Sequence, residues 1–90
     1  MKFERVWVRQ CQATKGIRRR HGAKSALDYL IGEKLMDFAE QAEQDLKFAH
    51  ELPRFLARIW QVFNPYEIAG YIASLKSNKR KKLQRLLLVR

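Results

Sequence analysis

The longest regular hydrophobic pattern in the chain covers residues 23–43. Its apolar positions recur every three or four residues, which matches one face of an α-helix. These positions are Leu27, Ile31, Leu35, Phe38 and Ala42. The charged positions between them are mostly acidic, and Asp28 follows Lys24 at the spacing that allows an ion pair along a helix. We therefore predict a central helix with an apolar face toward a core and an acidic face toward solvent.

The same periodicity predicts helices on both sides of the central one. The predicted helices cover residues 3–20, 23–43, 46–63, 65–77 and 79–88. We prefer a helix to a strand at residues 5–9, because no second strand pattern is present to pair with it. Pro53 either kinks or interrupts the third helix. The fold class is therefore all-α, a compact single-domain bundle of four to five helices with no sheet.

Local signals support several of these helices. Asn64 and Glu67 have the spacing of a capping box, with a proline between them at the first helical position. Phe63 and Ile68 flank this cap where a hydrophobic staple would form. Asp45 is a candidate N-cap for the third helix. From the apolar stripes we predict a core that includes Leu27, Ile31, Leu35, Phe38, Ile59 and Phe63.

Charge is distributed unevenly along the 90 residues, which carry a formal net charge of +10. Residues 1–21 hold seven cations and one acid, and residues 53–90 hold nine cations and one acid. Residues 22–52 between them hold three cations and seven acids. Such segregation favours a polyanion on the basic surfaces, or an acidic protein partner.

Two runs of cations are the candidate nucleic-acid contacts. The first run is Arg18, Arg19 and Arg20, and the second is Lys76, Lys79, Arg80, Lys81, Lys82 and Arg85. The guanidinium fork of arginine suits phosphate. The second run holds no acid and is interleaved with Leu75, Leu83 and Leu86, which favours a basic amphipathic helix over a solubilising tail. It also holds no bulky aromatic residue, which favours nucleic acid over a membrane surface.

Residues 67–75 resemble the first helix of a helix-turn-helix. The resemblance implies a DNA-binding arrangement in which a second helix follows a tight turn. A regular turn would place apolar anchors where Lys79 and Lys82 stand, so a variant with a longer turn around Ser77 and Asn78 fits better.

Residues suited to catalysis or metal binding form no recognisable set. His21 and His50 are far apart, Cys11 is the single cysteine, and the chain has no metal-ligand spacing and no phosphate-binding glycine loop. We expect Cys11 to be a buried thiol on the core side of the first helix. The sequence therefore predicts no enzyme activity, no cofactor and no metal.

No apolar run approaches the roughly 18 residues of a membrane span, and no signal-peptide pattern is present. A single cysteine suggests a reducing compartment. We therefore predict a cytoplasmic, non-enzymatic protein with an accessory or regulatory role that binds DNA or RNA mainly through phosphates. One alternative is a protein-interaction module or small inhibitor that docks an acidic or nucleic-acid-binding partner. Another is a homodimer in which the acidic central helix of one copy meets a basic flank of the other.

Overall fold

The computed structural model describes the backbone of residues 3–88 and the side chains of residues 6–88. Every regular element within residues 3–88 is a helix, so the all-α prediction is confirmed. The elements are α1 (Phe3–His21), α2 (Ala23–Leu27), η1 (Asp28–Leu35), α3 (Met36–Gln44), α4 (Leu46–Val62), α5 (Pro65–Ala73), α6 (Ser77–Leu83) and η2 (Gln84–Leu88). The two η elements are π-helical segments.

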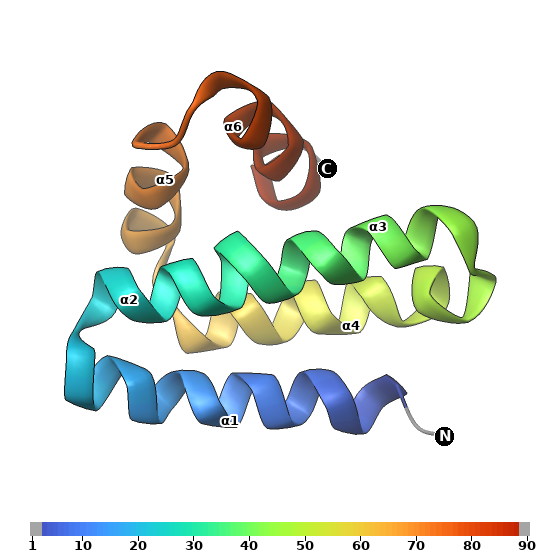
Figure 1. Ribbon diagram of the computed structural model, residues 1–90, viewed down its shortest axis with the longest axis horizontal. Coiled ribbons are helices and arrows are strands. Elements are labelled where there is room, and N and C mark those ends of the chain that lie inside the picture. The colour runs from blue at the N-terminus through green and yellow to red at the C-terminus, as the bar shows by residue number, and fades with distance from the viewer. Residues whose placement is uncertain (1–2, 89–90) are drawn as a thin grey trace.

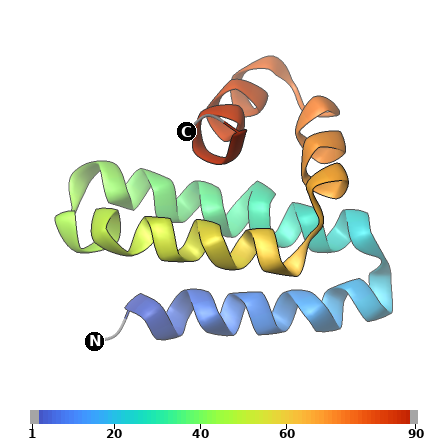
Figure 2. The same cartoon turned by 180° about the vertical axis from the view of Figure 1, so that it is seen from behind.

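The helices form three tiers (Figure 1). The elements α2, η1 and α3 follow one another as one long helix, and α4 returns alongside it. Helix α1 lies along one side of this pair. The segment from α5 to η2, which we call the C-terminal arm, crosses the opposite side, and the reverse view shows the same order (Figure 2). Helix α1 and the C-terminal arm therefore lie on opposite sides of the central pair.

Gly22 separates α1 from α2. Its φ angle is +92°, a left-handed conformation that glycine reaches without steric cost. The chain reverses direction here, so that α2 packs back against α1 (Figure 1). The glycine inside α1, Gly16, does not break that helix, which runs through to His21.

Side chains cap α4 and α5 as the sequence predicts. The Asn64 side chain accepts a hydrogen bond from the Glu67 N–H at 2.8 Å, and the Glu67 carboxylate accepts one from the Asn64 N–H at 3.1 Å. The Asp45 carboxylate accepts one from the Lys47 N–H at 2.9 Å at the start of α4. Pro53 lies inside α4, which continues to Val62, so it does not interrupt this helix.

The break between the last two helices is earlier than predicted. The predicted helix over residues 65–77 ends at Ala73, and the next helix begins at Ser77 instead of residue 79. The Ser74 hydroxyl donates to the Tyr71 carbonyl at 2.7 Å, and the Ser74 N–H also turns back to the last turn of α5. Lys76 then has extended backbone angles. Because Ser77 and Asn78 lie inside α6, the longer turn expected around them is absent.

The π-helical segment η1 in the middle of the central helix was not predicted. A π-helix closes its hydrogen bonds over five residues and is therefore wider than an α-helix. Leu27, Ile31, Leu35 and Ala39 are each four residues apart along this part of the helix, but that spacing is also common in α-helices and gives no signal for the π-helical segment. All four of these side chains are buried.

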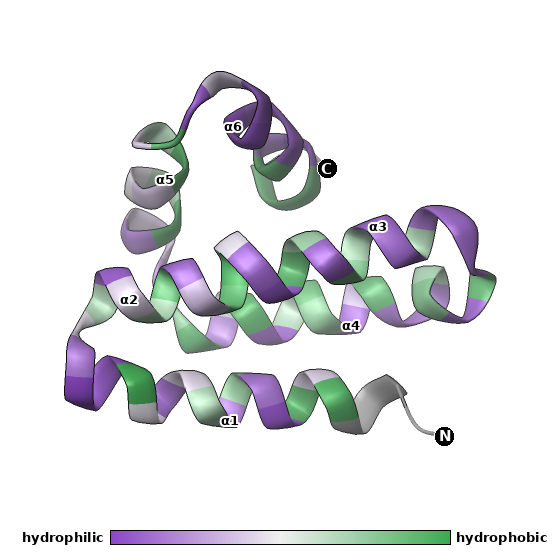
Figure 3. Cartoon of the chain, viewed as in Figure 1, coloured by the Kyte–Doolittle hydropathy of each residue, from purple (hydrophilic) through white to green (hydrophobic). Residues whose placement is uncertain are grey.

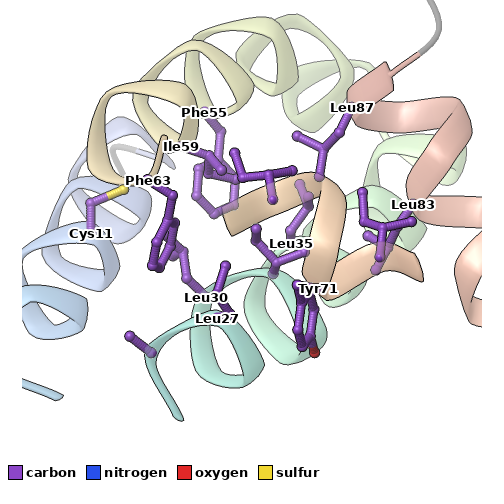
Figure 4. Close-up of a cluster of buried hydrophobic side chains, with 14 of the residues drawn as sticks. Cys11, Leu27, Leu30, Leu35, Phe55, Ile59, Phe63, Tyr71, Leu83 and Leu87 are labelled. Atoms are coloured by element: carbon purple, nitrogen blue, oxygen red, sulfur yellow. The ribbon is translucent and has the colours of Figure 1, made fainter. Parts of the chain in front are cut away.

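The six residues predicted to form the core are all buried, with exposed fractions of 6% or less. Side chains from the central helix, α4 and the C-terminal arm converge on one cluster (Figure 4). Colouring by hydropathy shows that α6 is mostly hydrophilic and that η2 is largely hydrophobic (Figure 3). The arm therefore shares the core of the bundle while it presents a polar helix to solvent.

Candidate nucleic-acid interface

The basic helix α6 is anchored to the bundle by leucines that follow its cations. Leu83 is fully buried and Leu87 is 3% exposed. They are four residues apart and therefore share one face of the arm. Burial of this face holds the second basic run on a packed helix. The predicted amphipathic character of this segment is therefore present in the isolated chain, and its leucines contact the chain's own core.

The six cations of the second run differ in exposure. Lys76, Lys81 and Arg85 are exposed, whereas Lys79, Arg80 and Lys82 are half-buried. The Lys82 ammonium lies 3.9 Å from the Glu43 carboxylate. Among the residues whose side chains are described, the other five cations form no ion pair. Five of the six cations of the second run therefore lack a direct ion-pair partner in this part of the chain.

Lys79 lies over the central helix, where it influences Asp28. Burial alone would raise the pKa of the Asp28 carboxyl group, but hydrogen bonds from Tyr71 and Lys24 and the charges of Lys24 and Lys79 outweigh burial and lower that pKa. The Lys24 ammonium lies 3.1 Å from Asp28, which is the ion pair predicted from their spacing. The charge of Lys79 therefore helps to stabilise the ionised form of Asp28 within the fold.

Arg18 of the first run has contacts within the fold that the sequence did not reveal. Its guanidinium forms an ion pair with Glu67 and donates to the Val62 carbonyl at 3.3 Å. It also lies 5.5 Å from the centre of the Phe63 ring. Arg18 therefore ties the end of α1 to the junction of α4 and α5. Its neighbours Arg19 and Arg20 are exposed.

The two basic runs lie on separate surfaces. The first run ends α1, and the second lies on the C-terminal arm, on the opposite side of the central pair (Figures 1 and 2). Sequence reasoning identified both runs, but their relative position depends on tertiary packing and could not be read from spacing.

Tyr71 is the aromatic residue closest in sequence to the second basic run, and the structure places it in the core. The side chain is 5% exposed, and its hydroxyl donates to the Asp28 carboxylate at 2.8 Å. Burial raises the pKa of the Tyr71 hydroxyl, and the hydrogen bond to Asp28 raises it further. The ring therefore has no free face for a base.

A groove lies between the arm and the hairpin of α3 and α4, and it was not anticipated from the sequence. We call it the arm groove; its volume is about 600 Å³. Its lining residues are Ala39, Ala42, Glu43, Ala49, Leu52, Asn78, Lys81, Lys82, Arg85 and Leu86. Part of the second basic run therefore borders an apolar hollow.

A metal-ligand cluster and a membrane-spanning helix were each sought in the described part of the chain. No group of three or more histidine, cysteine, aspartate or glutamate side chains is placed to hold a metal ion within residues 6–88. None of the helices within residues 3–88 is long and apolar enough to cross a membrane. Comparison with known proteins finds no family model that matches the chain, and no significant similarity to a curated protein or to a solved structure.

Proposed function

We propose that the protein is a non-enzymatic nucleic-acid-binding domain with an accessory or regulatory role, and that the second basic run, on and beside α6, carries its main contacts. The observation that supports this proposal is the anchored basic helix. Its cations lie on a segment whose backbone is held in place by Leu83 and Leu87, so that little backbone order has to be acquired on binding.

The exposed cations Lys76, Lys81 and Arg85 are the principal phosphate contacts in this proposal. Arg80 and the half-buried Lys79 and Lys82 add positive potential beside them. Contacts to phosphate fix the position of a nucleic acid but carry no base code, so we expect weak sequence preference.

Arg19 and Arg20 provide a second, smaller phosphate surface at the end of α1. We leave Arg18 out of it, because its guanidinium already bonds Glu67 and the Val62 carbonyl. We further propose that the protein acts in the cytoplasm as the reduced thiol form, consistent with its single cysteine.

The test measures affinity for short duplex DNA and single-stranded RNA as a function of salt concentration. Each phosphate neutralised by lysine or arginine contributes about −0.9 to the slope of log affinity against log salt on duplex DNA. The triple variant Lys76→Ala, Lys81→Ala, Arg85→Ala should therefore flatten this slope by roughly 3 units.

The matched control removes three exposed cations elsewhere. Arg9, Lys15 and Lys47 are exposed and lie outside both basic runs. Their combined change to alanine lowers the net charge by the same amount, and we expect it to change the slope by less than about 1 unit. Equal slopes for the two triple variants would refute the role of the second basic run. Failure of the wild-type protein to bind any nucleic acid at about 50 mM salt would refute the function itself.

A further inference from the structure

The arm groove has two chemically different walls. One wall, which we call the alanine wall, consists of apolar side chains from the hairpin. They are Ala39 and Ala42 from α3 and Ala49 and Leu52 from α4. The other wall belongs to the arm and carries Lys81, Lys82 and Arg85 beside Leu86. A ligand that fills the groove therefore needs an apolar face and, next to it, negative charge.

The charge of the groove is incompletely balanced. Glu43 is the only acid among the lining residues, and it lies 3.9 Å from Lys82. Lys81 and Arg85 form no ion pair among the residues whose side chains are described. Since an unpaired charge beside an apolar surface favours an opposite charge, the occupant should bring carboxylates to these two cations.

The spacing of the two cations matches that of a helix. Lys81 and Arg85 are four residues apart and both line the groove, so they are neighbours along the arm. Residues at this spacing on a helix have β-carbons about 5–6 Å apart. Two carboxylates one turn apart on a partner helix have the same separation and can therefore pair with both cations.

The apolar wall also suits a helix. The distance between two packed helices depends on the side chains at their contact, and alanines allow close approach. A phosphate backbone has no apolar face to cover Ala42, Ala49 and Leu52.

We propose that the arm groove is the docking site for an acidic amphipathic helix of a partner protein. Its apolar face packs on the alanine wall, and its glutamates or aspartates pair with Lys81 and Arg85. The net charge of +10 speeds the encounter with such a partner. This proposal does not depend on nucleic-acid binding, because it rests on the apolar wall as well as on the charges.

The test uses a synthetic helical peptide of about 16 residues, long enough to populate a helix. It carries leucines at i, i+3, i+4 and i+7 and glutamates one turn apart on the adjacent flank. It is titrated to about 1 mM into the full-length isotope-labelled protein, a range that reveals even weak binding. We expect saturable NMR shift changes at Ala39, Ala42, Ala49 and Leu86, which line the groove.

Two control peptides separate the contributions of shape and charge. One replaces the leucines by serine and keeps the glutamates, and the other replaces the glutamates by lysine. Each should bind about tenfold more weakly or not at all. Equal binding of the leucine-free peptide would overturn the proposal, because the site would then recognise only a polyanion. Absence of saturable shifts in the groove with the first peptide would also overturn it.

Variants of the protein give an independent answer. Lys81→Ala with Arg85→Ala should weaken peptide binding by about tenfold, whereas Arg9→Ala with Lys15→Ala should change it less than about twofold. Ala42→Trp would fill the groove from a half-buried position and should abolish binding. If the tryptophan variant fails to fold, the variant with Lys81→Ala and Arg85→Ala still tests the proposal. Unchanged binding in that variant would overturn the proposal, whatever the result with nucleic acid.

Discussion

The hydroxyl group of Tyr71 occupies the space that a β-carbon on Gly32 would need. The same hydroxyl donates a hydrogen bond to Asp28, one turn earlier in the π-helical segment, at 2.8 Å. Helix α5 is therefore docked on the central helix by a close approach that only glycine permits, and by a charged acceptor beside it. Lys79 and Lys24 lie near this contact and add positive charge to it.

Gly32→Ala should destabilise the protein by about 1–3 kcal/mol, because the added methyl group overlaps the Tyr71 hydroxyl. In a Tyr71→Phe background the same substitution should be neutral or stabilising. The nearest remaining ring atom, Cζ, lies 3.6 Å from the ideal β-carbon, and alanine is favoured over glycine in a helix by about 0.5–1 kcal/mol. Urea unfolding of the four proteins measures both effects. An equal loss in the two backgrounds would contradict the contact.

Asp28 should make the stability depend on acid pH. Its pKa is lower in the folded protein than its ordinary value, so the fold favours the carboxylate. This contribution is therefore complete above the ordinary aspartate pKa of about 3.9 and is lost as the pH falls through the folded-state pKa. Asp28→Asn should be less stable than the wild type near neutral pH, and the difference should shrink at lower pH. A difference that stays constant down to about pH 2 would contradict this role.

Substitutions of Arg18 and Arg19 should differ in their effect on the stability of the fold. Arg18→Ala removes a hydrogen bond and an ion pair that join α1 to the α4–α5 junction, and we expect a loss of about 1–2 kcal/mol. Arg19→Ala changes an exposed side chain and should alter stability by less than about 0.5 kcal/mol. Thermal or urea unfolding measures these changes. Similar losses for the two variants would show that the contacts of Arg18 add nothing specific.

Cys11 should react slowly with thiol reagents in the folded protein. Its side chain is 2% exposed, and burial raises its pKa to about 11 although the charges of Arg58 and Lys15 oppose this. The raised pKa keeps the reactive thiolate scarce at neutral pH, and burial keeps reagents away from the sulfur. Modification by a disulfide reagent should therefore follow unfolding, and the denatured protein provides the rapid control. A native reaction as fast as the denatured one would contradict burial of the thiol.

Features that depend on local sequence could be predicted. The buried positions of the central helix follow from their spacing, and the caps at Asn64 and Asp45 depend on side chains within three residues of each other. The thiol of Cys11 is buried, as expected from its place on the apolar face of α1.

Features that depend on packing could not be predicted. Nothing in the spacing of Arg18 and Glu67, 49 residues apart, indicates that they form an ion pair. The arm groove exists because α6 lies over the α3–α4 hairpin, and the sequence specifies this only through the joint burial of Leu83, Leu87 and the central helix. The exact end of α5 was also missed, since serines at both 74 and 77 are compatible with a turn.

The wide turns of η1 have a consequence for changes in chain length. An α-helix rotates by about 100° per residue, so a deletion within α4 would turn every later side chain away from its place in the core. The π-helical segment Asp28–Leu35 instead holds about one residue more than a regular helix over the same rotation. Deletion of the half-buried Lys34 could be absorbed by conversion to α-helix, with Phe38 and Ala39 kept in register. The segment η1 is thus a place in the helical core where one residue can be lost without rotating the later core side chains.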